Sequence, residues 1–322
     1  MSAAIQPSVP PLPTEPFVAE PLAEQKWTAP IEDVAGDGLV AVGVKRCFSY
    51  RTLGTADGQP VIALHGTPGS RLKFVGAHAA AQQHGIRLIA PDRWGYGATT
   101  AHEAPTLSRF ARDIGHFADR LGLGRFGVLG IAGGGPFAVA IAAEMPERVT
   151  SLALAAPVGP IAGEPEDEIT PFHRLCFATL SQQRPAVEAA FQAFRTILDV
   201  SPDAGVRAAM LRIAAADRRM LLRKDIATHI GQTFIEGLRP GVVGPVTDLS
   251  LFGTPWHVDL ARVRAPARIW LGSEDENIPR SAALRLAAQL PQCEFTDLSG
   301  EGHLWIADHF ETVLSWMAGH GK

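Results

Sequence analysis

The sequence lacks several features that would place it in a particular class of protein. Its three cysteines lie far apart and include no CxxC pair, so neither a disulfide framework nor a zinc ribbon is expected. No apolar run reaches the roughly 18 residues that a membrane-spanning helix needs. The formal net charge is −4, which indicates no basic surface for nucleic acid or an anionic membrane. The first residues have neither the basic start nor the apolar segment of a signal peptide, so we expect a cytoplasmic location.

What is present is an ordinary globular composition, with 46% hydrophobic and 19% charged residues. Residues 1–35 are rich in proline and predict an extended arm. From Gly36 on, "LVAVGVKRCFSYRTLG" predicts a hairpin, and short apolar runs alternate with amphipathic helical patterns. These runs are "QPVIALHG", "IRLIAPD", "FGVLGIA", "TSLALAAP" and "ARIWLGS". The alternation predicts an α/β fold, with a mainly parallel sheet and helices on both faces.

The alternation stops between Pro157 and Ala265, where only helical patterns are found. Long insertions between sheet elements often act as lids over a site. We therefore expect a helical cap to be inserted before the strand "ARIWLGS". The basic stretch "DRRMLLRK" within it is interpreted as a solvated helix face. The expected domains are the arm (1–35), the first part of the core (36–158), the cap (159–255) and the second part of the core (256–322).

The stretch "FGVLGIAGGGPFAVA" has the pattern of a strand, a very tight turn and a helix. Gly130 and Gly134 fit such a turn because strand and helix must approach closely around a strained apex. The apex is Ala132, the position that carries the nucleophile in the G-x-S-x-G motif. The amide of Gly133 would point at the site from a helix N-terminus. A glycine-rich turn without chemistry is the alternative.

Three further stretches lie near expected strand ends or open a helix. They are "LHGTPGS", "SEDENIP" and "GEGHLW". Acids at the carboxyl end of a parallel strand lie on the face where α/β sheets place their sites, and Glu274, Asp275 and Glu276 all qualify. His303 is the histidine in the most suitable setting. The other histidines are interpreted as surface groups or, like His65, as holding a loop in place.

Together these stretches resemble the α/β-hydrolase family, over about Leu39 to Ala318. "PDRWGYGATT" also resembles the family's Asp-Arg-x-Gly-x-Gly-x-Ser turn. The order of nucleophile position, acid and histidine is the family's order. The resemblance implies an α/β-hydrolase fold and selects Asp275 as the acid, because "GSEDENIP" matches the family's acid loop. It further implies an oxyanion hole formed by the amides of Thr67 and Gly133, and a mechanism that needs no metal and no organic cofactor.

Ala132 departs from the family pattern. Members with an aspartate nucleophile usually carry a tryptophan after it, whereas Ala-Gly-Gly-Gly-Pro resembles the flank of the serine branch. A change from serine to alanine removes only the hydroxyl, and it is the change an experimenter makes to trap an intact substrate. We therefore interpret the chain as a serine hydrolase inactivated at Ala132, with Asp275 and His303 as the remaining members of the triad.

The expected substrate is a small carboxylic ester with a bulky hydrophobic or aromatic part. The predicted contacts are Trp94, Phe172, Trp256 and Trp305. Amide, lactone and carbon–carbon bond hydrolysis stay open. Two other classes also fit Ala132: an enzyme of the cofactor-free oxygenase or lyase type that uses only a His–Asp pair, and a ligand-binding homologue without catalysis. The only partner that we expect is this small hydrophobic molecule; neither nucleic acid nor a membrane is expected. A homodimer is left open.

Overall fold

The computed structural model describes residues 36–43, 45–162, 170–209 and 214–321. These residues belong to one compact unit. The predicted arm of residues 1–35 lies outside the described residues. No helix in the described ranges is long and apolar enough to cross a membrane.

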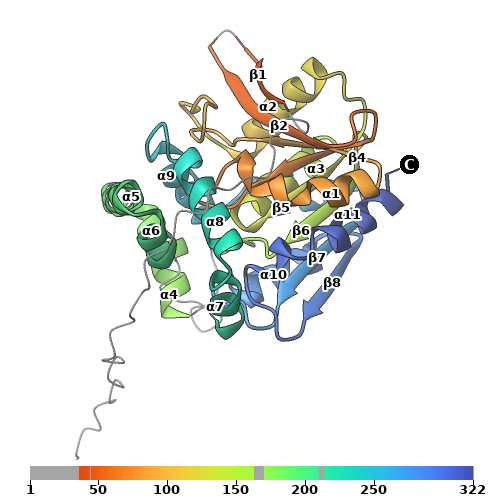
Figure 1. Cartoon of the computed structure of the whole chain (residues 1–322). Helices are drawn as coiled ribbons and strands as arrows, with labels where there is room; N and C mark the ends of the chain where they lie inside the picture. The colour runs from red at the N-terminus through yellow and green to blue at the C-terminus, as the bar shows by residue number, and fades with distance from the viewer. Residues whose placement is uncertain (1–35, 44, 163–169, 210–213, 322) are drawn as a thin grey trace, which may run out of the picture. The chain divides into compact units, whose positions relative to one another are not determined.

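An eight-stranded sheet forms the centre of this unit, in the spatial order β1-β2-β4-β3-β5-β6-β7-β8 (Figure 1). The first two strands form an antiparallel hairpin, β2 also pairs antiparallel with β4, and all pairs from β4 to β8 are parallel. The strands are β1 (Asp37–Ala41), β2 (Cys47–Gly54), β3 (Gln59–Leu64), β4 (Ile86–Pro91), β5 (Phe126–Ile131), β6 (Val149–Ala155), β7 (Ala267–Gly272) and β8 (Cys293–Leu298). The predicted hairpin and mainly parallel sheet are confirmed.

Helices cover both faces of the sheet, as predicted. On β3, Ile62 and Leu64 belong to the hydrophobic cluster under α2 and α3, whereas Val61 and Ala63 belong to the cluster under α1 and α11. This alternation follows from the two-residue period of a strand, and it shows that both faces are buried. The helices are α1 (His78–Gln83), α2 (Leu107–Arg120), α3 (Gly135–Glu144), α10 (Arg280–Gln289) and α11 (Phe310–Gly319).

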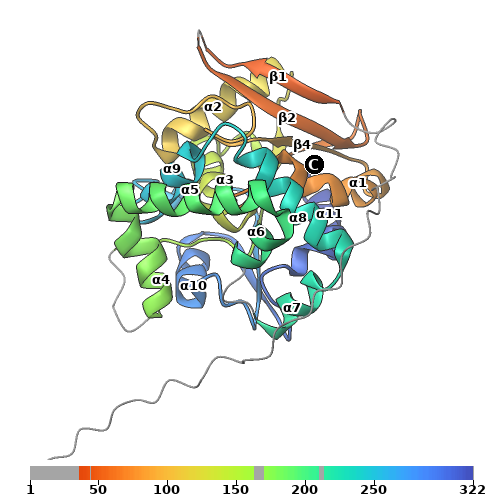
Figure 2. The same cartoon turned by 60° about the vertical axis from the view of Figure 1, so that its left-hand side comes forward.

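The described residues between β6 and β7 form six further α-helices, and we call them the inserted helices. Figures 1 and 2 show them gathered on one side of the sheet. One of them, α8, packs against the short helical segment η2 (Arg71–Ala77), which follows β3. They are α4 (Pro171–Arg174), α5 (Arg184–Val200), α6 (Pro202–Ala209), α7 (Ala215–Leu221), α8 (Lys224–Gly237) and α9 (Val243–Phe252). The described part of the insertion is thus helical, as its sequence pattern predicts.

Candidate active site

Ala132 lies at the apex of a tight turn between β5 and α3. Its φ angle is 48°, in the left-handed region that a residue with a side chain rarely adopts. The turn can be this tight because its neighbours lack side chains. A Cβ on Gly130 would lie 2.8 Å from the Cβ of Ala138, and one on Gly134 would lie 2.3 Å from the carbonyl oxygen of Leu64. The sequence therefore builds a strained apex that presents residue 132 at the end of the strand.

His303 and Asp275 form a hydrogen-bonded pair at the neighbouring strand ends. Asp275 follows β7 and His303 follows β8, and Nδ1 of the imidazole lies 2.8 Å from Oδ2 of the carboxylate. The side chain of Asp275 is fully buried, and its Oδ1 accepts the amides of Asn277 (2.8 Å) and Ile278 (3.1 Å). Three hydrogen bonds thus fix the orientation of this carboxylate toward the imidazole. The competing candidates Glu274 and Glu276 are exposed.

The electrostatics of His303 reflect this pairing. Burial by itself favours the neutral imidazole, but the charge of Asp275 and its hydrogen bond favour the imidazolium. Their combined effect is larger, so the pKa of His303 is raised above its usual value.

Asp217 of α7 holds the loop that carries His303. Its Oδ2 accepts the amide of His303 at 2.9 Å, and its Oδ1 accepts the amide of Leu304 at 2.7 Å. Burial raises the pKa of Asp217, although these two bonds favour its charged form. The interpretation of "DRRMLLRK" as a solvated face was wrong for its first residue: Arg218 and Arg219 are exposed, but Asp217 is buried against the loop of His303.

His65 fixes the loop after β3. Its Nε2 accepts the amide of Arg93 at 3.0 Å, so its Nδ1 carries the proton that reaches the carbonyl oxygen of Gly66 at 2.8 Å. Burial and the nearby charge of Arg93 hold the pKa of His65 well below its usual value, and the ring is neutral. The predicted role of His65 in holding a loop is confirmed by these bonds.

The same loop brings Thr67 against the tight turn at Ala132. A Cβ on Gly133 would lie only 2.2 Å from Oγ1 of Thr67, so the two residues predicted for the oxyanion hole lie directly against each other. The Thr67 hydroxyl donates to Oδ2 of Asp248 at 2.6 Å and accepts from Nη2 of Arg93 at 3.0 Å. Its backbone is therefore anchored by its side chain, which leaves the amide independent of that network.

Arg93 and Asp248 form the centre of this buried network. The guanidinium is 1% exposed and donates to Oδ1 of Asp248 at 2.5 Å, while Oδ2 also accepts the hydroxyl of Tyr96 at 2.6 Å. Asp248 belongs to α9, so the network joins an inserted helix to the loop of Thr67. The motif "PDRWGYG" thus stabilises the loop of Thr67 and does not line the cavity described next.

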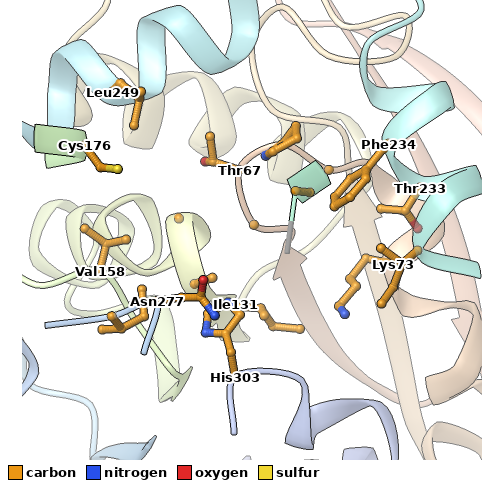
Figure 3. A pocket seen from close by; sticks show the side chains of 18 of the residues that line it. Thr67, Lys73, Ile131, Val158, Cys176, Thr233, Phe234, Leu249, Asn277 and His303 are labelled. Atoms are coloured by element: carbon orange, nitrogen blue, oxygen red, sulfur yellow. The ribbon is translucent and has the colours of Figure 1, made fainter. Parts of the chain in front are cut away.

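One cavity of about 360 Å³ joins these parts. Ala132, Gly133, Thr67 and His303 all line it, together with residues of the inserted helices (Figure 3). Most of the lining is apolar. Its aromatic members are Phe177, Phe191, Phe194, Phe234 and Phe252, and its polar side chains include Lys73, Thr233 and Asn277.

The structure does not bring the predicted tryptophans to this cavity. Trp94 packs on Phe110 and donates to Asp113, and Trp305 is buried in the cluster under α1 and α11. Trp256 packs at the margin of the cluster under α2 and α3. These side chains are core packing, and the aromatic lining comes from phenylalanines instead. The side chain of Phe172, the fourth predicted contact, lies outside the described residues.

Lys73, Thr233 and Asn277 were missed by the sequence analysis. A signal existed for two of them. Lys73 is the one charge in the apolar stretch "LKFVGA" close behind the His-Gly loop, and Asn277 stands two residues after Asp275. Thr233 lies in the middle of a helical pattern and carries no comparable signal. Within the described ranges, no group of three or more histidine, cysteine, aspartate or glutamate side chains is arranged to hold a metal ion.

Comparison with known proteins places this arrangement in a family. A family profile described as alpha/beta hydrolase fold matches residues 59–310. The chain therefore belongs to the α/β-hydrolase fold family, as the resemblance of its motifs implies.

Individual relatives differ in what their names describe. Haloalkane dehalogenase 2 of Mycobacterium tuberculosis is 33% identical over 102 residues, which are 30% of this chain and about a third (34%) of that protein. Non-heme chloroperoxidase of Streptomyces lividans is 25% identical over 82% of this chain and 92% of its own. The solved structure of a thermophilic esterase from Thermogutta terrifontis has a TM-score of 0.65 at 19% identity, covering 89% of this chain and 100% of the esterase. At that identity the likeness concerns the fold alone.

Proposed function

We propose that the chain has the framework of a serine hydrolase acting on a small carboxylic ester, with Ala132 in place of the nucleophilic serine. One observation carries the proposal: His303, hydrogen-bonded to the buried Asp275, lines the same cavity as the strained apex at Ala132. A left-handed apex, a histidine and a fixed buried acid together match the requirements of nucleophilic acyl transfer. Membership of the α/β-hydrolase fold family agrees with a hydrolase of this class.

A serine at position 132 would act through these groups. Nε2 of His303 would take the proton from its hydroxyl as the oxygen attacks the ester carbonyl carbon. Nδ1–H would stay hydrogen-bonded to Asp275, which stabilises the imidazolium. The amides of Thr67 and Gly133 would donate to the tetrahedral oxyanion. His303 then gives its proton to the departing alcohol, and a water molecule hydrolyses the acyl group by the same steps.

The inserted helices are proposed to act as the cap of this enzyme, over residues 159–255. They supply Phe191, Phe194 and Phe234 to the cavity. An apolar lining of this kind favours an ester with a hydrophobic or aromatic part. Selectivity for the substrate would therefore depend on the insertion, while the chemistry would depend on the sheet.

Restoring the hydroxyl tests the proposal. The Ala132→Ser variant is expected to hydrolyse short 4-nitrophenyl esters and to be labelled by a fluorophosphonate at position 132. The unmodified chain should not be labelled, and it should be slower by at least thousands-fold, because triad knockouts lose that much. The double variant Ala132→Ser with His303→Ala is the control for the base. Absence of both labelling and turnover in Ala132→Ser would overturn the proposal.

The alanine itself favours a second candidate, an enzyme that uses His303 and Asp275 as a base without a covalent step. In that case Ala132 is the native residue. The unmodified chain would then be active, His303→Ala would abolish the activity, and Ala132→Ser would add little. The same three variants thus separate the two functions.

A further inference from the structure

Lys73 is a cation inside a cavity that is otherwise largely apolar. It lies on η2, just after the loop of Thr67, and its side chain lines the cavity from the side opposite Asn277 (Figure 3). Burial lowers the pKa of Lys73 to about 8, so the ammonium is charged at neutral pH. Among the residues that the structure describes, no side chain pairs with this ammonium.

The two carboxylates that hold His303 make no recorded hydrogen bond or ion pair with Lys73, and their oxygens are engaged elsewhere. Asp275 binds His303 and two backbone amides, and Asp217 binds the amides of His303 and Leu304. A partly buried charge without a partner is unfavourable, and proteins normally pair it. The partner is therefore expected to come from the molecule that fills the cavity.

Thr233 provides a second unsatisfied group in the same place. Its hydroxyl is buried and has no hydrogen-bond partner among the described residues, and Thr233 lines the cavity from α8. His229 stands one turn earlier on this helix, and its Nε2 donates to the carbonyl oxygen of Lys73 at 3.3 Å. Residues four apart on a helix share a face, so the contact of His229 turns Thr233 toward η2. In Figure 3, Thr233 and Lys73 lie on the same side of the cavity.

We propose that the substrate carries a carboxylate, and that Lys73 and Thr233 bind this carboxylate while the phenylalanines hold its hydrophobic body. This inference rests on the proposed function and names the substrate class of that site. One ammonium and one hydroxyl match the single charge and two oxygens of a carboxylate. The anionic group would thus lie at the Lys73 side of His303, and the scissile ester would lie beside Ala132.

Binding to the unmodified chain tests the subsite without any turnover. The probes are 3-phenylpropanoate and 3-phenylpropanamide, which differ in charge but hardly in shape, and the measurement is calorimetry at pH 7. We expect the acid to bind at least about tenfold more tightly, since hydrogen bonds to charged groups exceed neutral ones by that margin. Lys73→Met should remove the preference and leave the amide unaffected, and Thr233→Val should reduce it severalfold.

Lys224→Met is the matched control, because it removes the same charge from an exposed position on α8. It should leave both affinities unchanged. Lys73→Met should melt at the same temperature as the parent chain or higher, since it removes an unpaired charge. Failure of 3-phenylpropanoate to bind, equal affinity for acid and amide, or an unchanged preference in Lys73→Met would each overturn the subsite.

Kinetics in the Ala132→Ser background separate the subsite from the proposed function. The substrates are 4-carboxyphenyl butyrate and 4-carbamoylphenyl butyrate. We expect Lys73→Met to raise KM for the first ester only; an equal fall in kcat for both would instead make Lys73 a catalytic group and contradict the proposal. Fluorophosphonate labelling reports the nucleophile independently. If the acid binds but Ala132→Ser is not labelled, the subsite stands and the serine hydrolase is refuted. If Ala132→Ser is labelled but the acid does not bind, the serine hydrolase stands and the subsite is refuted.

Discussion

His303 is held by two carboxylates that act on different parts of the residue. Asp275 contacts the ring, and Asp217 contacts the backbone amide. Both negative charges favour the imidazolium and outweigh the effect of burial, so the pKa of His303 lies above its usual value. A general base must be neutral to accept a proton, so this shift moves the working range of the site toward higher pH.

The pH profile of Ala132→Ser should show this shift. We expect kcat/KM for a neutral 4-nitrophenyl ester to fall as the pH drops through the raised pKa of His303, and to level off above it. Asp275→Asn removes the main stabilising charge, so the midpoint should move to lower pH while the rate falls by up to about 10⁴-fold. A midpoint that does not move in this variant would show that Asp275 does not set the protonation of His303.

Among the elements, α7 has a role that its sequence conceals. Its stretch "ADRRML" has the charge density of a solvated helix, and two of its arginines are indeed exposed. Asp217 faces the other way because the His303 loop offers two amides that have no other partner in their own loop. Sequence pattern reports hydrophobic faces, but it does not report an acid that meets backbone amides from a distant segment.

Asp217→Asn should therefore slow the reaction by disturbing the loop that positions His303, although Asp217 itself does not contact the substrate. The amide has one acceptor oxygen where the carboxylate has two, so one buried N–H of the loop loses its partner, at about 1–3 kcal/mol of unfolding free energy. In the Ala132→Ser background we expect kcat to fall with KM nearly unchanged, measured with a neutral 4-nitrophenyl ester. Asp225→Asn, at an exposed position on α8, is the control. Equal kcat in the two variants would limit Asp217 to a local role in packing.

For the whole molecule, buried parallel strands and the order of motifs were sufficient to predict the α/β-hydrolase fold. The strand β8 was missed because it lies at the edge of the sheet, where "CEFTDL" alternates polar and apolar residues and forms no apolar run. The tryptophans were misassigned because aromatic residues are as common in a core as in a pocket. The cavity itself depends on how the inserted helices pack on the sheet, which no local pattern encodes.

The ion pair of Arg93 and Asp248 joins the sheet to the insertion, so its loss should lower the stability of the whole molecule. Asp248→Asn leaves the guanidinium buried without its counter-charge, so we expect the free energy of unfolding in urea to drop by about 3–5 kcal/mol. The double variant Arg93→Met with Asp248→Leu should lose less. Asp297→Asn breaks an exposed pair with Arg280 and should cost under about 1 kcal/mol. Similar losses in Asp248→Asn and Asp297→Asn would argue against the buried pair as a joint between the two parts.

Two acids of the insertion, Asp217 and Asp248, hold the loops of His303 and Thr67. The insertion is thus not interchangeable: grafting another protein's insertion onto this sheet would displace the loops of His303 and Thr67 together with the cavity. By contrast, α5 and α6 line the cavity through Phe191, Phe194 and Ala209, and no hydrogen bond recorded for their described residues reaches either loop. Laboratory evolution toward new substrates should therefore accumulate its tolerated changes on α5 and α6, and spare α7 and α9.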